Sequence, residues 1–243
     1  MRTGAVTGHK YFSSSPHLSL ESQLPLVRAF NTEKITIDTK QPFTKMFQLD
    51  SAPALLVVDM QNGFCHKQGS FAKIGLQSEP TAIIPHINEL RSAFRAANIP
   101  VFFLRTGYNA DYSDRRGRDR GDCLEELQGL IRGSWDADIL DELTPEPDEK
   151  VVDKTRNSGF FRTSLENTLK ERGVNHLILT GVGTDVCVET TARDAYQMDF
   201  AVTTVSDATG TCNKPDHLAA LHALRMFGGT ASTAEVIEAL QKS

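Results

Sequence analysis

The chain has 243 residues, of which 40% are hydrophobic and 23% are charged, and its 26 Lys and Arg against 31 Asp and Glu give a net charge of −5. These proportions are typical of a globular protein and exclude disorder, a collagen-like chain or a coiled coil as a description of the whole sequence. The acidic balance disfavours nucleic acid as a partner, because phosphate binding needs concentrated Lys and Arg. No apolar run reaches roughly 20 residues, the length that a membrane span requires, so we expect a cytoplasmic protein without a membrane partner.

The N-terminal part of the chain lacks the pattern of a folded core. Residues 1–33 are predicted to form an extension of uncertain structure. The first twenty of them include Arg2 and Lys10 but no acidic residue, which gives a faint likeness to a transit peptide. We expect the segment 34–49 to form a short hairpin and residues 34–243 to form a single domain.

Five apolar runs have the continuity expected of strands that are buried on both faces of a sheet. They are Ala54–Asp59, Pro100–Leu104, Lys150–Asp153, His176–Gly181 and Ala201–Ser206. The stretch 106–122 between the second and third runs is polar and rich in Gly and Arg, and we expect it to form a loop.

Helical patterns separate these runs. The first helix is predicted from about Ile83 to Phe94, with Pro80 near its start. The second opens on the capping box Thr163–Glu166, in which a hydroxyl caps the helix and a glutamate reaches back to the cap's amide. Gly173 ends this helix as a left-handed C-cap.

Three more helices are expected in the C-terminal part of the chain. They cover Asp185 to about Met198, Leu218–Met226, and a final segment opened by the capping box Ser232–Glu235. Strands that alternate with helices form βαβ units around a parallel sheet. The sequence therefore predicts an α/β fold.

Three reactive side chains stand at or beside the carboxyl ends of predicted strands, where the sites of open parallel sheets lie. Asp59 closes the first strand, Lys154 follows the third, and Cys187 follows the fourth through a glycine-containing loop. Taken singly, each has an ordinary structural explanation, as a turn residue, a solvated surface lysine and a small core residue. All three on one sheet edge together indicate a catalytic site.

A thiolate is the form that this arrangement predicts for Cys187. The thiol is expected at the start of a helix, where unsatisfied amides and a partial positive charge lower a cysteine pKa, and Lys154 lowers it further. Asp59 can accept the thiol proton and later return it to a leaving nitrogen. The amides of Gly183 and Cys187 can bind an oxyanion, so acyl transfer from an amide to sulfur and then to water fits the site.

Other ligand chemistries fit the sequence less well. Gly181 and Gly183 follow a strand as in a dinucleotide-binding turn, but Val186 stands at the third glycine position. No G-x-x-x-x-G-K-[ST] or H-E-x-x-H motif occurs, and the seven His are scattered. The four cysteines fit no zinc template, and free thiols are expected in a chain of this size. We therefore expect neither a cofactor nor a metal.

These motifs together resemble the isochorismatase-like cysteine hydrolase superfamily from Ala52 to Leu240. The shared motifs are Leu55–Phe64, Asp153-Lys154 and Thr180–Ala195. The resemblance implies a Rossmann-like three-layer α/β/α sandwich and a catalytic triad of Asp59, Lys154 and Cys187. It also implies a cis peptide bond between Val182 and Gly183 and a homo-oligomer, either a dimer or a tetramer.

Two branches of this superfamily share most with the chain. Gly133–Asp136 and Ser158–Phe161 resemble ureidoacrylate amidohydrolases, whereas Asp59–Cys65 and His217–Ala220 resemble biuret hydrolases. A nicotinamidase is disfavoured, because the segment 105–111 lacks the histidine of that branch's metal-binding motif. Both remaining branches are implied to cut a urea-like C–N bond in a small N-carbamoyl compound.

Positions in these motifs also suggest substrate contacts. The expected contacts are Phe64, Arg105, Thr106, Tyr108 and Asn157. Thr106, Tyr108 and Asn157 stand where the ureidoacrylate branch tends to carry other residues, so the resemblance does not define the substrate. Arg105 and Arg156 can each bind a substrate carboxylate through two parallel hydrogen bonds.

The sequence thus predicts a cysteine-dependent amidohydrolase that cleaves a C–N bond of a small ureido or N-carbamoyl compound and releases ammonia. Two alternatives stay open. One is an isochorismatase that cleaves a vinyl ether, against which Cys187 argues, because true isochorismatases are implied to lack this cysteine. The other is a non-catalytic binding protein on the same fold.

Overall fold

The computed structural model describes residues 48–50, 52–78, 81–115 and 123–242. Within these residues, six parallel strands form one sheet in the order β3-β2-β1-β4-β5-β6. The strands are β1 (Pro53–Val58), β2 (Val101–Thr106), β3 (Lys150–Lys154), β4 (His176–Val182), β5 (Ala201–Gly210) and β6 (Thr230–Ala231). The predicted extension 1–33 and nearly all of the predicted hairpin 34–49 lie outside the described residues.

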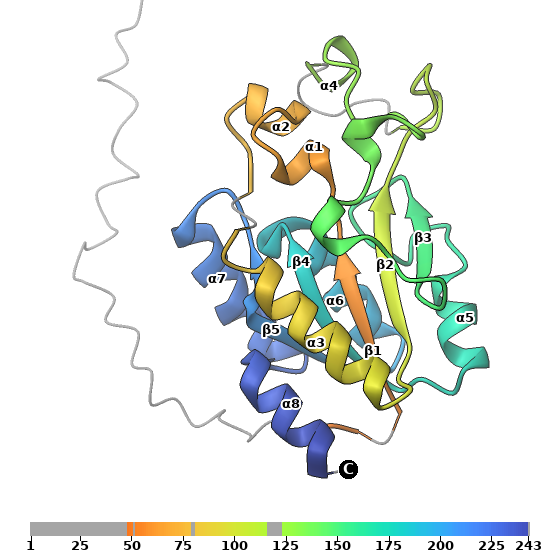
Figure 1. Ribbon diagram of the computed structural model, residues 1–243, viewed down its shortest axis with the longest axis vertical. Coiled ribbons are helices and arrows are strands. Elements are labelled where there is room, and N and C mark those ends of the chain that lie inside the picture. Colours follow the sequence, from red (N-terminus) through yellow and green to blue (C-terminus); the bar gives the residue numbers. More distant parts are fainter. Residues whose placement is uncertain (1–47, 51, 79–80, 116–122, 243) are drawn as a thin grey trace, which may run out of the picture. The chain divides into compact units, whose positions relative to one another are not determined.

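Helices cover both faces of the sheet, with α3 and α8 in front of it and α6 behind it in Figure 1. The longer helices are α3 (Ile84–Ala96), α5 (Leu165–Glu171), α6 (Glu189–Gln197), α7 (Lys214–Leu224) and α8 (Thr233–Lys242). The short ones are α1 (Asn62–Cys65), α2 (Ser70–Lys73), α4 (Cys123–Glu126), η2 (Trp135–Ala137), η3 (Asp141–Leu143), η4 (Thr184–Val188) and η5 (Arg225–Phe227). The predicted α/β fold is confirmed.

The central strand β1 is apolar throughout because both of its faces are buried. Side chains alternate along a strand, so Leu55 and Val57 join the buried cluster that contains Ile87 of α3. Leu56 and Val58 join the opposite cluster, which contains Leu165 of α5. Parallel sheets are covered on both faces, which explains why the strand appears in the sequence as a continuous apolar run.

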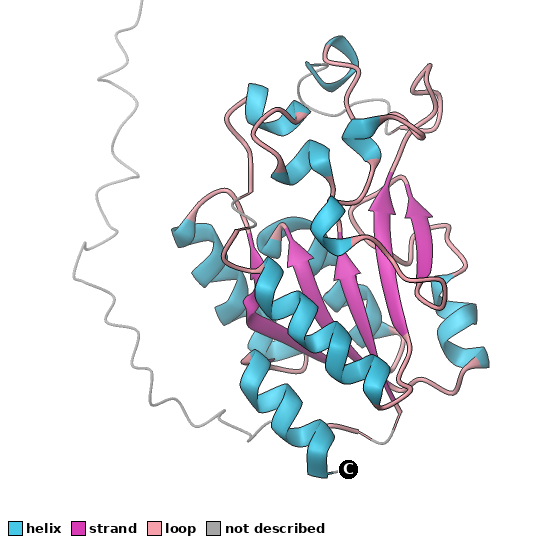
Figure 2. Ribbon diagram, in the orientation of Figure 1, coloured by secondary structure: helices cyan, strands magenta, loops and turns pink. Residues whose placement is uncertain are grey.

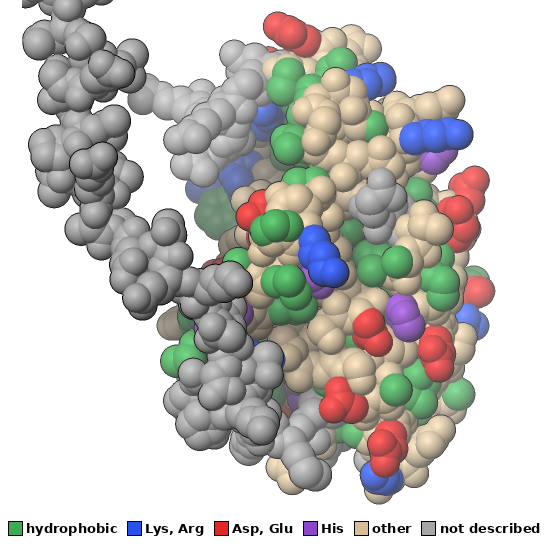
Figure 3. Space-filling model, turned by 90° about the vertical axis from the view of Figure 1, so that its left-hand side faces the viewer, with side chains coloured by type: hydrophobic (Ala, Val, Ile, Leu, Met, Phe, Trp, Pro, Cys, Tyr) green, Lys and Arg blue, Asp and Glu red, His purple; other side chains and the backbone are tan. Residues whose placement is uncertain are grey.

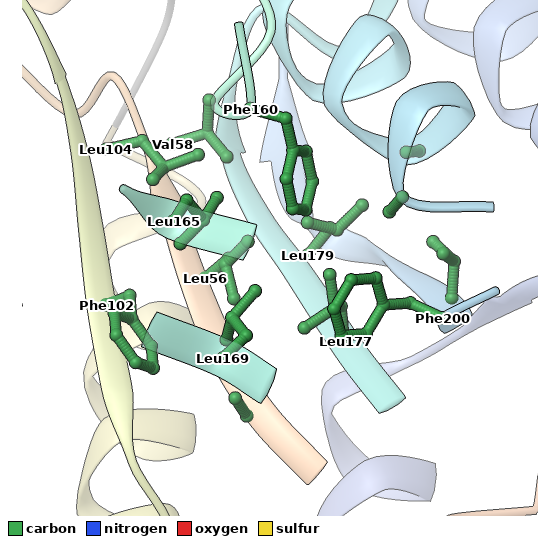
Figure 4. Close-up of a cluster of buried hydrophobic side chains, with 14 of the residues drawn as sticks. Leu56, Val58, Phe102, Leu104, Phe160, Leu165, Leu169, Leu177, Leu179 and Phe200 are labelled. Atoms are coloured by element: carbon green, nitrogen blue, oxygen red, sulfur yellow. The ribbon is translucent and has the colours of Figure 1, made fainter. Parts of the chain in front are cut away.

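The second of these clusters gathers side chains from distant parts of the chain (Figure 4). Leu165 and Leu169 of α5 are fully buried against the strands, and each such side chain stabilises the fold by about 1.5–3 kcal/mol. The rings of Phe160 and Phe200 stack with their centroids 6.0 Å apart. This packing anchors the segment that leaves β3, immediately after Lys154.

The strand order creates the position of the site. The chain passes from β1 to β2 and β3 on one side, and then crosses to β4, β5 and β6 on the other. All strand arrows end at the same edge of the sheet (Figure 2). In such sheets ligands bind beyond the carboxyl ends of the strands where the order reverses, which here is the end of β1.

Of the helices α3 and α7, one starts where the sequence predicted and the other does not. Helix α3 begins at Ile84, next to the predicted start at about Ile83, and Pro80 lies outside the described residues. Helix α7 begins at Lys214, one turn before the predicted start at Leu218, and the side chain of Asn213 accepts a hydrogen bond from the amide of its first turn (2.9 Å). The first turn of α7 is polar and exposed, so it carries no apolar pattern that could reveal it.

The two predicted capping boxes have different outcomes. At the start of α8, the amide of Ser232 donates to Glu235 (2.7 Å) and the amide of Glu235 donates to the Ser232 hydroxyl (3.3 Å), so this box is confirmed. The box predicted at Thr163 and Glu166 is confirmed only in part, because the Thr163 hydroxyl accepts a hydrogen bond from the amide of Leu165 (3.2 Å) but Glu166 does not reach back. Helix α5 starts at Leu165, one residue later than that box requires, and Glu166 instead pairs with Lys170 one turn along the helix (2.7 Å).

The last two strands were predicted incompletely. Strand β5 runs to Gly210 rather than ending at Ser206. Strand β6 was not predicted, because a strand of two residues is too short to show a hydrophobic pattern. The helix predicted from Asp185 consists of the π-helical turn η4 followed by α6. The left-handed C-cap at Gly173 is confirmed by its φ of +69°.

The described surface mixes side chains of different kinds. On the face shown in Figure 3, hydrophobic, acidic and basic side chains are interspersed. None of the helices in the described residues is both long enough and apolar enough to cross a bilayer.

Candidate active site

A buried ion pair lies at the carboxyl ends of β1 and β3. The Nζ atom of Lys154 is 2.7 Å from Oδ2 of Asp59, and each side chain is 1% exposed. Thr106, at the end of the intervening strand β2, joins the two groups. Its hydroxyl accepts a hydrogen bond from Lys154 (2.8 Å) and donates one to Oδ1 of Asp59 (2.9 Å). Residues 95 positions apart in sequence thus form one polar cluster inside an apolar core.

Cys187 reaches this cluster from the other side of β1. Strand β4 pairs with β1, and η4, which carries Cys187, follows β4 after the single residue Gly183. The thiol is buried, and both Asp59 and Lys154 interact with it. The peptide bond between Val182 and Gly183 is cis, at the position that the resemblance implied. The structure therefore brings the three predicted side chains together.

The surroundings of Cys187 favour the protonated thiol over the thiolate that the sequence predicted. Burial raises its pKa well above the ordinary value, the positive charge of Lys154 opposes this effect, and the negative charge of Asp59 adds to it. For Lys154, burial acts to lower the pKa, but Asp59 and Cys187 outweigh it and the pKa is raised. The surroundings therefore favour a charged lysine and a neutral thiol.

Two unusual backbone conformations hold the ends of β1 and β4 against each other. Asp59 has a φ of +51°, in the left-handed region that few residues other than glycine adopt. Gly181 has a φ of +103°, and a Cβ atom at this position would lie 2.0 Å from the carbonyl oxygen of Val58. Only glycine permits this close approach, which brings the loop before Cys187 next to the strand that ends at Asp59.

The loop around Gly183 is closed by its own backbone. The carbonyl of Gly183 accepts hydrogen bonds from the amides of Val186 (3.0 Å) and Val188 (3.1 Å), which wind the chain into the turn that carries Cys187. The hydroxyl of the fully buried Thr184 lies 2.9 Å from Nδ1 of His217 in α7. This contact, which ties α7 to the turn, was not predicted from the sequence.

Gln61 is a second structural element of the site that sequence reasoning missed. Its Oε1 accepts a hydrogen bond from the amide of Thr106 (2.8 Å). Its Nε2 donates to the carbonyls of Thr106 (2.7 Å) and Ala137 (2.8 Å). The side chain, which is fully buried, thereby fixes the end of β2 from both sides. Its place two residues after Asp59, within the shared motif, was the available signal.

Tyr108 is the other predicted substrate contact that the structure places near the triad. Burial raises the pKa of its hydroxyl, and the charges of Lys154 and Asp59 also act on it. The phenol is therefore a neutral group that can donate a hydrogen bond near the Cys187 thiol.

The remaining three predicted substrate contacts are Arg105, Asn157 and Phe64. Arg105 forms a two-pronged pair with Asp153, through Nε (2.6 Å) and Nη2 (3.1 Å). Thr106 and Lys154 point to the site, so their strand neighbours Arg105 and Asp153 point to the other face of the sheet. Asn157 is exposed. The ring of Phe64 packs against Phe71 of α2, with centroids 4.5 Å apart.

The thiol of Cys65 also lies close enough to Asp59 to interact with its charge. Burial raises the pKa of Cys65 to about 12, and Asp59 adds to the effect. Cys65, Cys187 and Cys212 all carry free thiols. In the described part of the chain, no group of three or more His, Cys, Asp or Glu side chains is placed to hold a metal ion.

Comparison with known proteins gives relatives over most of the chain. The ureidoacrylate amidohydrolase RutB of Yersinia enterocolitica is 37% identical over 201 residues, which cover 76% of this chain and 87% of that protein. The protein of the same name from Pseudomonas syringae pv. syringae is 38% identical over 170 residues, 64% of this chain and 69% of that protein.

A solved structure is similar as well. A cysteine hydrolase from Pseudomonas syringae pv. phaseolicola superimposes with a TM-score of 0.71 at 30% identity, covering 81% of this chain and 96% of that one. The model of the isochorismatase domain family matches residues 53–236, which include the triad and every strand. The chain belongs to the isochorismatase family.

Proposed function

We propose that this protein is a cysteine-dependent amidohydrolase that cleaves a C–N bond of a small ureido or N-carbamoyl compound and releases ammonia. One observation carries the proposal: the buried thiol of Cys187 interacts with the carboxyl group of Asp59, which forms an ion pair with the buried Lys154. Such a carboxylate is a base poised to take the thiol proton, and the lysine stabilises the charges that result. The family and the relatives' activity as amidohydrolases support the same class of reaction.

The first half of the reaction forms a bond between sulfur and carbon. Asp59 takes the proton of the Cys187 thiol as the sulfur attacks the carbonyl carbon of the substrate. Because the thiol pKa is raised at rest, this transfer occurs together with the attack rather than before it. The carbonyl oxygen becomes an oxyanion, which the amides of Gly183 and Cys187 receive. Asp59 then gives its proton to the nitrogen, the C–N bond breaks and ammonia leaves.

The second half frees the enzyme. A water molecule gives a proton to Asp59 and attacks the carbonyl carbon of the thioester-like intermediate. The C–S bond breaks, the sulfur recovers its proton from Asp59, and the acyl group leaves. From a ureido compound that group is a carbamate, which decomposes to an amine and carbon dioxide. Lys154 stays charged throughout and keeps the carboxylate in place, through hydrogen bonds to Asp59 and Thr106.

The test compares two cysteines that both lie near Asp59. Replacement of Cys187 by Ser or Ala is expected to lower ammonia release from a ureido substrate by about a thousandfold or more, as for other catalytic nucleophiles. Cys65→Ala, which removes the other buried thiol, is expected to keep the activity per folded molecule. Circular dichroism checks that each variant folds. Turnover that survives in Cys187→Ala, or is lost in Cys65→Ala alone, would contradict the proposal.

The choice of product separates the alternatives. An isochorismatase would release pyruvate from isochorismate, and a binding protein would release neither product. Assays of ammonia and of pyruvate on the same preparation, with biuret, 3-ureidoacrylate and N-carbamoyl amino acids as candidate amides, therefore decide between the three functions.

A further inference from the structure

Arg156 lies beside the triad and holds a positive charge for which the described residues offer no carboxylate. Its own carbonyl accepts a hydrogen bond from Lys154 (3.0 Å), so its backbone is fixed directly against the polar cluster. Its guanidinium donates through Nη1 to the carbonyls of Asp114 (2.9 Å) and Thr155 (2.6 Å). It is partly buried and lies over the ring of Phe161, with 5.6 Å between Cζ and the ring centroid.

Three other arginines of this region are already paired with acids. Arg105 binds Asp153 at 2.6 Å, Arg115 binds Glu125 at 3.2 Å, and Arg132 binds the carboxylate of Asp114 at 2.7 Å. The carboxylate of Asp114 therefore pairs with Arg132, whereas the backbone carbonyl of Asp114 accepts the hydrogen bond from Arg156.

The charge balance near the triad favours an anion at this point. Asp59 and Lys154 neutralise each other, and burial raises the pKa of the Cys187 thiol, which favours its uncharged form. The charge of Arg156 is thus left uncompensated among the described residues, although a partly buried charge is costly without a counter-ion. The hydrogen bonds that Arg156 makes to described residues use Nη1, which leaves Nε and Nη2 as the two prongs that a carboxylate binds best.

We infer that Arg156 is the receptor for a carboxylate on the substrate, and hence that this protein prefers ureido compounds that carry a carboxylate over neutral ureas. The inference rests on the proposed function, because it places that carboxylate on the compound whose C–N bond Cys187 attacks. The hydroxyl of Tyr108 lies close enough to Lys154 and Asp59 to interact with their charges. It can therefore donate a hydrogen bond that orients the same substrate.

A purely structural role for Arg156 is the competing explanation, since its two backbone contacts join the end of β3 to the Asp114 segment. The two roles differ in their dependence on substrate charge. The probes are 3-ureidopropanoate and propylurea, which has the same ureido group and a similar length but no carboxylate. The control is Arg162→Gln, which removes a guanidinium from over the same Phe161 ring (5.2 Å) at an exposed position.

The expected result is a selective loss. Arg156→Gln should lower kcat/KM for ammonia release from 3-ureidopropanoate by about tenfold to a hundredfold, chiefly through KM, and leave propylurea nearly unchanged. Arg156→Lys should recover part of the loss, and Arg162→Gln should leave kcat/KM unchanged for both substrates. An equal loss for both substrates, or no loss for 3-ureidopropanoate, would overturn the inference.

Binding to inactive protein separates this inference from the proposed function. Calorimetric titration of 3-ureidopropanoate into Cys187→Ala should give a Kd that rises by a similar factor when Arg156→Gln is added. If that shift occurs although the parent protein releases no ammonia, the proposed function fails and the carboxylate receptor stands. If ammonia is released but the Kd does not shift, the receptor is refuted and the function stands. If 3-ureidopropanoate neither binds nor reacts, the inference is overturned.

Discussion

Replacement of Lys154 by Met tests how strongly the fold depends on the buried ion pair. The lysine donates three hydrogen bonds, to Asp59 (2.7 Å), Thr106 (2.8 Å) and the carbonyl of Arg156 (3.0 Å). Methionine fills a similar volume but leaves the carboxylate of Asp59 charged in a site that is 1% exposed. Removing one partner of such a buried pair costs about 3–5 kcal/mol, so we expect the free energy of unfolding at neutral pH to fall by that amount.

Lys170→Met is the matched control. Lys170 pairs with Glu166 at the same distance of 2.7 Å, but the two side chains are 57% and 38% exposed. Solvent screens this pair, and an i,i+4 pair on a helix surface contributes only about 0.3–0.5 kcal/mol. The ratio between the two losses therefore compares a buried lysine with an exposed one at the same N–O distance.

The double variant Asp59→Asn/Lys154→Met completes the cycle. It removes the uncompensated charge, so it should lose less stability than the two single variants together, by about 2 kcal/mol or more. Urea unfolding followed by circular dichroism gives all of these free energies. A loss below about 1 kcal/mol for Lys154→Met, which is typical of exposed pairs, would refute the reasoning, as would a double variant that loses the full sum.

Three further predictions concern the backbone, the thiol and the pH dependence. Gly181→Ala should destabilise the protein by about 3 kcal/mol or more, because the added Cβ would lie 2.0 Å from the carbonyl oxygen of Val58. Gly133 also has a positive φ but has open space around it, so Gly133→Ala should cost only about 1 kcal/mol. Urea unfolding measures both losses. At about pH 8, iodoacetamide should alkylate the buried Cys187, whose thiol pKa is raised, more slowly than the exposed Cys212. Peptide mass spectrometry measures both rates. A faster reaction at Cys187 would restore the thiolate interpretation. Burial lowers the pKa of His176, so the unfolded chain takes up a proton at a higher pH than the folded protein does. The free energy of unfolding should therefore fall as the pH drops below about 6.5. If His176→Gln does not weaken this fall in urea titrations, another group causes it.

The sequence was sufficient for the parts of the site that depend on local pattern. Continuous apolar runs separated by helical periods indicate parallel strands, and polar residues at the ends of those strands identify Asp59, Lys154 and Cys187 without any contact being known. These signals lie within one strand or one loop. The capping box at Ser232 succeeded for the same reason, since all of its hydrogen bonds are made within one turn.

Only the tertiary structure decided which groups are buried and which are already paired. The helix start and the lysine argued for a thiolate at Cys187, but the burial that raises the pKa of this thiol arises from distant strands and helices of the described residues. The partner of Arg105 became visible only when β2 and β3 were in register, and the same register brought Thr106 between Asp59 and Lys154. Burial and pairing are sums over distant neighbours, so a local pattern of residue types cannot contain them.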